Sequence, residues 1–185
     1  MQPVLFVTVW LLVLSAVTGY PTGAPVARCV DMTPGHGVPS QTSPSPYTIV
    51  ISSTTFTPTQ SIRVTIQGPM YLGLLLQARS NNTDAVGTWG TPPPDTKYLA
   101  CSNNSQGAIT HSNRNSKNNE TTYTWIPPDS IESAFIRATV VANRTTFWVN
   151  LSSEKLSRAS GAAAEVKMAI TPVMFLAFLM SMAFQ

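Results

Sequence analysis

The amino-acid sequence predicts an all-β fold, an antiparallel β-sandwich, for the polar stretch between two apolar ends. Short segments rich in Thr, Val and Ile recur along this stretch, and Pro, Gly and Asn separate them, as is typical of sandwich domains. Helical periodicity is absent between the two ends. About 140 residues remain without the ends, which suits one domain with its own hydrophobic core.

The first part of this stretch, residues 20–46, is expected to form an extended lead-in that belongs to the same domain. It is rich in proline, which removes strand hydrogen-bond donors, and in glycine, which loosens the backbone. The residues concerned are Pro25, Pro34, Gly35, Gly37, Pro39, Pro44 and Pro46. We therefore expect no regular secondary structure before residue 47.

The predicted sandwich spans residues 47–155, and its strands follow from β-branched composition and alternation. They are expected at 47–52, 61–67, 71–79, 96–101, 108–111, 121–125, 136–141 and 146–151. In the second of these segments, Ile62, Val64 and Ile66 share one face. The third is a more continuous apolar run, which is typical of a strand covered on both sides.

The amino-terminal end, residues 1–19, is predicted to be a signal peptide. An apolar run over residues 4–14 is followed by small residues, with Val17 and Gly19 at the −3 and −1 positions of a cleavage site before Tyr20. The run is short for a membrane span. A signal anchor and a buried strand are the alternative interpretations.

The carboxyl-terminal end is predicted to direct attachment of a glycosylphosphatidylinositol (GPI) anchor. Residues 156–168 form a spacer of small and polar residues, and residues 169–185 form a hydrophobic tail. Ser160 is followed by two further small residues and is the expected lipidation site, with Ser157 as an earlier alternative. A transmembrane tail competes with this interpretation, but Pro172 interrupts the apolar stretch and no basic residue follows it. A tail with neither role is the third alternative.

The formal net charge is +3, and the basic residues are scattered singly rather than clustered. A nucleic-acid-binding protein usually concentrates them on one face or in one run, so we expect no nucleic-acid partner. A membrane-lytic peptide would need a much higher charge density. The weak positive balance still favours anionic surfaces as partners.

Cys29 and Cys101 are the two cysteines of the chain. In an oxidising compartment an isolated pair is expected to form one disulfide, and two free buried thiols are the alternative. A disulfide here would close a loop of about 70 residues, which stabilises a fold by about 4 kcal/mol in the chain-entropy model. There is no CxxC motif to indicate a zinc knuckle or a redox site.

Five sequons predict N-glycosylation, at Asn81, Asn103, Asn119, Asn143 and Asn150. Each asparagine is an acceptor only if it is exposed in the lumen of the secretory pathway. Three of the sequons lie in Asn/Ser/Gly-rich segments that are typical of loops. Asn150, in contrast, lies within an expected strand.

The sequence contains no evident catalytic or metal-binding set, so we expect neither an enzyme activity nor a cofactor. His36 and His111 are the two histidines, and together with Asp31 they are too few to predict a metal site. A structural, hydrogen-bonding role near the disulfide is expected for both. The many serines are not accompanied by a G-x-S-x-G motif.

Two residues are candidate ligand contacts. Trp89 lies between Gly87 and Gly90 in an expected loop, so its ring is the best candidate for an exposed surface that stacks on carbohydrate, although core packing explains large aromatics more simply. Arg79 ends an expected strand, where its guanidinium is a candidate to recognise a phosphate or carboxylate. A solvated strand end is the simpler interpretation of Arg79.

A series of short motifs runs through the stretch between the apolar ends. They are Tyr20–Pro25 leading to Cys29, Met32–His36, Ile62–Ile66 with Gly68, Gly73–Arg79, Gly87–Trp89, Cys101, Ala108–Ser112, Lys117, Thr124–Pro128, Ala138–Val141 and Phe147–Trp148. In their order and spacing they resemble the reeler domain, the amino-terminal module of reelin and the spondins. Within that family the chain most resembles the short, stand-alone defence proteins.

This resemblance implies an immunoglobulin-like β-sandwich with a Cys29–Cys101 disulfide. It also implies an extracellular or cell-surface binding module that recognises microbial surface glycolipids or glycans in innate defence. The alternative that it implies is a matrix or adhesion module that binds a host matrix component, either a protein or a glycosaminoglycan. The third is a non-catalytic relative of the amino-terminal domain of ferric-chelate reductases, whose second soluble domain and haem-bearing membrane domain this chain is expected to lack.

Overall fold

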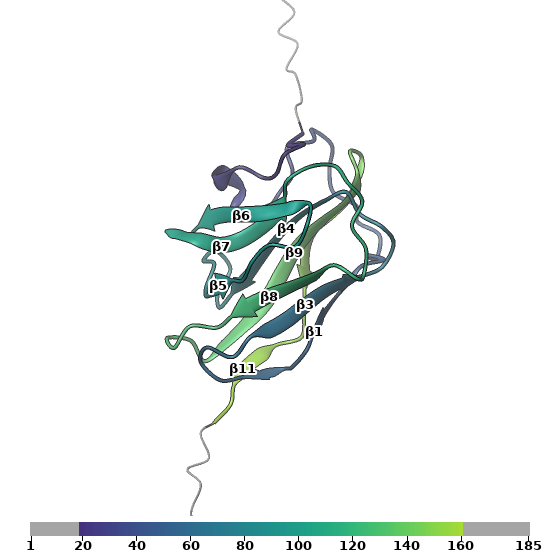
Figure 1. Ribbon diagram of the computed structural model, residues 1–185. Helices are drawn as coiled ribbons and strands as arrows, with labels where there is room; N and C mark the ends of the chain where they lie inside the picture. Colours follow the sequence, from purple (N-terminus) through teal and green to yellow (C-terminus); the bar gives the residue numbers. More distant parts are fainter. Residues whose placement is uncertain (1–18, 161–185) are drawn as a thin grey trace, which may run out of the picture.

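The computed structural model describes residues 19–160, which form two β-sheets packed against each other (Figure 1). The smaller sheet has the strand order β1-β3-β8-β5, and all of its pairings are antiparallel. Its strands are β1 (Thr48–Ile51), β3 (Ile62–Gln67), β5 (Thr88–Trp89) and β8 (Thr122–Ile126). The predicted all-β sandwich is therefore confirmed.

The larger sheet has the order β2-β11-β9-β4-β7-β6, and β10 also pairs with β9. Its pairings are antiparallel except for that between β11 and β2, which is parallel. The strands are β2 (Thr55–Phe56), β4 (Gly73–Arg79), β6 (Thr96–Cys101), β7 (Asn104–His111), β9 (Ser133–Asn143), β10 (Thr146–Ser152) and β11 (Leu156–Arg158).

The main core lies between the two sheets and follows from the alternation of their strands. Ile62, Val64 and Ile66 of β3 are buried while the residues between them are not, as expected. Two tyrosines carry polar groups into this core, and the hydroxyls of Tyr71 and Tyr123 hydrogen-bond each other at 3.0 Å. Burial raises the pKa of Tyr71 to about 12. The paired hydroxyls stay neutral and satisfied, so their burial is tolerated.

Strand β4 is buried along its whole length, which confirms the prediction of a strand covered on both sides. It lies between β9 and β7 in the middle of the larger sheet. Its inner face packs on the smaller sheet, and the amino-terminal segment covers its outer face. The 3-10 helix η1 (Val26–Arg28) of that segment lies beside β6 (Figure 1). A second, smaller core is thereby formed, consisting of Cys29, Met32, Leu75, Ala85, Leu99, Cys101 and Ala108.

The structure contains elements that the sequence did not predict. The lead-in contains η1, and the very short strands β2, β5 and β11 were missed. Strand β11 lies beyond residue 155, where the sandwich was expected to end, and its Leu156 is fully buried. The expected spacer therefore begins as part of the sheet. Such short strands form because neighbouring strands pair with them, so their own amino-acid composition does not predict them.

The predicted leader and the predicted hydrophobic tail lie outside the described residues. Within residues 19–160, no helix is long and apolar enough to cross a membrane.

Candidate functional site

The amino-terminal segment is fastened to the larger sheet by a disulfide. Cys29, just after η1, is bonded to Cys101 at the end of β6, with 5.6 Å between the Cα atoms. The predicted disulfide is confirmed, and the free-thiol alternative is wrong. Met32 and Leu75 pack around the bridge. The disulfide thus closes the smaller core on the outer face of the sheet.

Arg79 provides a second fastening, and its predicted role as a ligand contact is wrong. Its side chain is only 5% exposed. The guanidinium donates hydrogen bonds to the carbonyl oxygens of Cys29 and Val30 and to that of Asn82, and Nε donates to Gln77 Oε1 at 2.8 Å. Four of its five N–H groups donate within the protein, and its burial keeps the guanidinium away from an external anion.

Trp89 is also not an exposed ligand contact, because its ring is 1% exposed. The residue forms strand β5 and pairs with Trp125 of β8, and this pairing turns its side chain into the main core. The flanking glycines Gly87 and Gly90 suggested a loop, but the two-residue strand is an edge of the smaller sheet. The simpler interpretation, core packing, is therefore the correct one.

The five sequon asparagines are all exposed: Asn81, Asn103, Asn119, Asn143 and Asn150. Asn150 lies in β10 as expected, but at an irregularity in the pairing with β9, and it adopts a positive φ of 58°. Exposure makes each of them sterically available, and their glycosylation stays a prediction.

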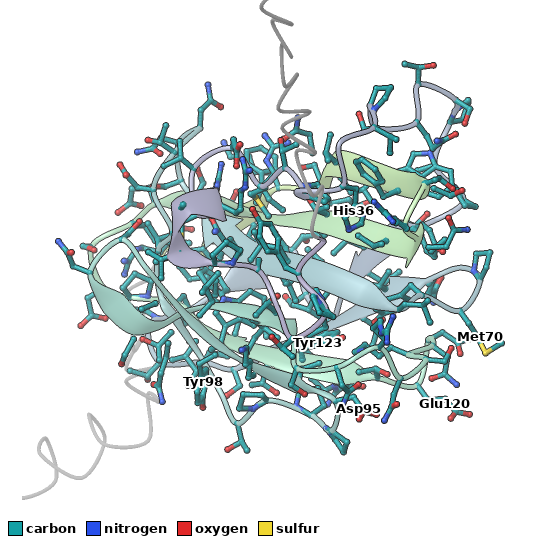
Figure 2. The ribbon with its side chains drawn as sticks, turned by 90° about the horizontal axis from the view of Figure 1, so that it is seen from above. His36, Met70, Asp95, Tyr98, Glu120 and Tyr123 are labelled. Atoms are coloured by element: carbon teal, nitrogen blue, oxygen red, sulfur yellow. A yellow bond between two sulfur atoms is a disulfide. The ribbon has the colours of Figure 1, made fainter. Side chains whose placement is uncertain are left out.

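A pocket with both polar and apolar walls lies where the amino-terminal arm, residues 19–46, crosses the larger sheet. We call it the amino-terminal pocket, and its volume is about 270 Å³. Its lining residues are Gly19, Tyr20, Pro21, His36, Leu72, Gly73, His111, Arg114, Val141, Asn143 and Arg144. In Figure 2, His36 lies among the packed side chains, whereas Met70 and Glu120 lie at the margin of the molecule. The pocket thus brings together both histidines, which are far apart in the sequence.

His111, at the end of β7, connects the arm to the sheet. Its Nδ1 lies 3.2 Å from both the backbone nitrogen and the carbonyl oxygen of Leu74. Nε2 lies 2.8 Å from the Tyr20 carbonyl oxygen and donates to it. His111 thus has the predicted structural, hydrogen-bonding role, but at the end of β6 and β7 that lies opposite Cys101 and not near the disulfide.

The amino-terminal arm can lie close to the larger sheet because two of its glycines have no side chain that would collide with neighbouring atoms. Gly23 has a φ of 112°, a left-handed conformation that favours glycine, and a Cβ there would collide with the His111 carbonyl oxygen. A Cβ on Gly35 would come within 2.8 Å of the Tyr20 ring. A side chain at either position would push the arm off the sheet and open the pocket wall.

The charged residues that line the pocket are all basic. Arg114, Arg144 and the two histidines line it, and neither Asp nor Glu occurs among its described lining residues. Burial lowers the pKa of His36, and the charges of Arg144 and His111 act in the same direction, against a backbone hydrogen bond with Arg144 that raises it. The Nδ1 atom of His36 is buried and has no hydrogen-bond partner in the part of the chain that the structure describes. The apolar walls come from Leu72 and Val141 and their neighbours.

This arrangement is suited to binding. Within residues 19–160 there is no group of three or more His, Cys, Asp or Glu side chains that could hold a metal ion. Positive charge next to apolar wall is what an anionic group on an apolar carrier needs. Sequence reasoning missed the site because no local pattern links His36 to His111, or either of them to Arg114 and Arg144.

The neutral histidines make the stability of the domain depend on pH. Burial lowers the pKa of His111 and of His36 below 6.5 in the folded state. Above about pH 6.5 the imidazoles are neutral in both states, whereas below it the unfolded chain binds more protons. The free energy of unfolding, measured in urea from about pH 7.5 to 5, is therefore expected to fall as the pH falls.

A His111→Gln variant tests the origin of this pH dependence. It is expected to be less stable at about pH 7.5, because the bond to Tyr20 is weakened, and to show a shallower pH dependence down to about pH 5. The lowered pKa of Asp95 acts only at more acidic pH, near the ordinary range of carboxyl groups. An unchanged pH dependence in the variant would show that His111 is not one of the groups responsible.

Comparison with known proteins agrees with the fold. The family model of the Reeler domain matches residues 27–164. "Putative defense protein Hdd11" of Hyphantria cunea is 39% identical over 149 residues, which cover 76% of this chain and 89% of that protein. "Putative defense protein 3" of Antheraea mylitta is 37% identical over 145 residues, covering 76% and 87%.

A longer relative and a solved structure complete the comparison. "Ferric-chelate reductase 1" of Mus musculus is 32% identical over 166 residues, which cover 85% of this chain but 27% of that protein. The crystal structure of the Reelin-N domain of F-spondin superimposes with a TM-score of 0.55 at 18% identity, covering 72% of this chain and 98% of that one. At that identity the structural likeness concerns the fold alone.

Proposed function

Because the chain belongs to the reeler domain family, we propose that it is an extracellular binding module of innate defence that recognises microbial surface glycolipids or glycans. Its similarity to stand-alone proteins with defence names, over most of their length, supports this function. On this proposal the domain acts by binding and not by catalysis, since His111 serves a structural hydrogen bond to the Tyr20 carbonyl oxygen.

The observation that carries the proposal is the amino-terminal pocket. It combines two arginines and two histidines with apolar walls, and its described lining has no acidic residue. Microbial envelope amphiphiles such as lipopolysaccharide and lipoteichoic acid present anionic groups beside apolar chains. The pocket fits that combination better than it fits a neutral polysaccharide, which would need stacking aromatic rings on the surface.

We further propose that the protein acts at the cell surface through a GPI anchor on Ser160. Ser160 is exposed and follows the last strand, whereas the alternative Ser157 lies within β11, where its N–H donates to the Thr54 carbonyl oxygen at 2.9 Å. Attachment at Ser157 would cut the chain inside the sheet. Release of the protein from intact cells by phosphatidylinositol-specific phospholipase C tests the anchor, and retention after treatment would contradict it.

Binding to microbial amphiphiles is expected to depend on Arg114, which is exposed in the loop after β7 and lines the pocket. The domain is titrated with lipopolysaccharide, lipoteichoic acid and β-glucan, with binding followed by calorimetry. We expect saturable binding of the two anionic amphiphiles. An Arg114→Glu variant is expected to bind them about tenfold more weakly, because one charge-assisted contact is lost and a repulsive charge is added.

Arg63→Glu is the matched control. Arg63 is exposed on β3 of the smaller sheet, and its substitution changes the net charge by the same amount as Arg114→Glu. Equal weakening by both variants would indicate non-specific charge attraction rather than a site. The absence of saturable binding to all three probes would overturn the proposed function. Salt-sensitive retention on heparin without microbial binding would favour the matrix or adhesion alternative.

A further inference from the structure

Tyr20, the first residue after the predicted cleavage site, is fixed by several contacts with the rest of the domain. The Tyr20 carbonyl oxygen accepts hydrogen bonds from His111 Nε2 at 2.8 Å and from the Gly23 N–H at 3.1 Å. Its ring lies 5.9 Å from the Arg28 guanidinium, which also donates to its hydroxyl at 3.4 Å. The ring also packs on Gly35. The backbone of Tyr20 therefore has a defined place beside the pocket.

The peptide bond between Gly19 and Tyr20 lies in the wall of the pocket. Both residues line it, and a Cβ placed on Gly19 would lie 3.2 Å from Cδ2 and 3.4 Å from Nε2 of His36. The bond that a signal peptidase is predicted to cut is thus next to His36. Hydrolysis adds water across it, leaving a carboxylate on Gly19, which departs with the leader, and an α-ammonium group on Tyr20.

We propose that the α-ammonium group of Tyr20, created by removal of the leader, completes a phosphate-binding site in the amino-terminal pocket together with Arg114 and His36. This inference deepens the proposed function and rests on it, because it names the group that the pocket recognises on a microbial amphiphile. It also makes removal of the leader a maturation step for binding.

The charge and geometry of the pocket support this assignment. A new positive charge would join a described lining that already holds Arg114 and Arg144 and contains no acidic residue. Like charges held together by the fold are relieved by an anion. A phosphate supplies up to two negative charges and several acceptor oxygens, enough for several donors at once, and hydrogen bonds to charged groups are the stronger ones. The Nδ1 atom of His36 has no partner among the described residues, and it donates to a phosphate when the imidazole is protonated.

The experiment compares two forms of the protein that differ only at the amino terminus. One begins at Tyr20, and the other carries a Gly-Ser dipeptide before Tyr20, which converts the amine into an amide and moves the charge away. Inorganic phosphate is titrated at about pH 7 and constant ionic strength. The ring signals of the two histidines are followed by NMR, so the readout comes from the pocket itself. We expect saturable shifts in the form that begins at Tyr20 and a Kd about tenfold higher in the extended form.

A second modification separates charge from bulk. Transamination of the Tyr20 amine to a ketone removes the charge without lengthening the chain, and it is expected to weaken phosphate binding to a similar extent. Equal phosphate affinity in all three forms, or no saturable shift of either histidine, would overturn the inference.

Failure of this inference can be told apart from failure of the proposed function. Lipopolysaccharide is tested beside the same material after phosphatase treatment, and only the untreated material is expected to bind tightly. If both bind equally while the phosphate titration fails, the protein recognises the amphiphile by another group and only this inference is lost. If phosphate shifts the histidines but none of the microbial probes binds, the phosphate site stands and the proposed function is lost.

Discussion

Replacement of both Cys29 and Cys101 by alanine is expected to lower the free energy of unfolding by about 4 kcal/mol. The disulfide joins residues separated by 72 positions and closes the smaller core. Without it the unfolded chain gains the conformational freedom of a long loop, and the amino-terminal segment is held mainly by its polar contacts. Urea denaturation of the variant and of the unmodified protein, monitored by tryptophan fluorescence, measures the difference.

The unmodified protein in reducing buffer is the control for this prediction, because it loses the same covalent link without any change of side chain. It is expected to match the double variant. A loss below about 1 kcal/mol in both cases would show that packing of the amino-terminal segment suffices without the bridge. A large loss in the double variant alone would instead indicate a packing defect at the alanines.

Replacement of Arg79 by leucine is expected to lower the free energy of unfolding by about 3 kcal/mol or more. The substitution leaves the carbonyl oxygens of Cys29, Val30 and Asn82 and the side-chain oxygen of Gln77 without this donor. A buried acceptor that loses its hydrogen-bond donor destabilises the folded state by its full desolvation penalty. Urea denaturation gives the magnitude, and hydrogen exchange is expected to be faster in the amino-terminal segment.

The matched control for Arg79 is Arg63→Leu, an identical change on the exposed face of β3. It is expected to change stability by less than about 0.5 kcal/mol. Arg79→Lys separates charge from geometry, since a lysine ammonium lacks the planar fork that serves several oxygens at once. Full stability of the lysine variant would contradict the importance of the fork, and a tolerated leucine would contradict the role of Arg79 altogether.

The strands that could be predicted are those whose own residues alternate or are continuously apolar. Strands β3 and β4 are examples, because the burial of a β-branched side chain on one face leaves a period of two in the sequence. Strands β2, β5 and β11 leave no such period, since each has two or three residues and exists through its partners. The end of the domain was therefore placed too early, before β11.

The two candidate ligand contacts failed for a related reason. Trp89 was assigned to a loop from its glycine neighbours, yet pairing with Trp125 places its ring in the core. Arg79 was assigned to a strand end, yet the amino-terminal segment folds back over β4 and covers it. In both cases residues distant in sequence bury the side chain, and a buried side chain cannot contact a ligand from outside.

By itself the sequence determined the fold class, the family and the pair of cysteines that would be joined, because periodicity and motif order are properties of the chain. Tertiary structure alone decided that His36, His111, Arg114 and the amino-terminal arm surround one pocket. Those residues come from separate loops and strand ends, and their meeting depends on how the lead-in crosses the larger sheet. Side chains acquire a shared electrostatic environment only when the backbone brings them together, so no local pattern could predict it.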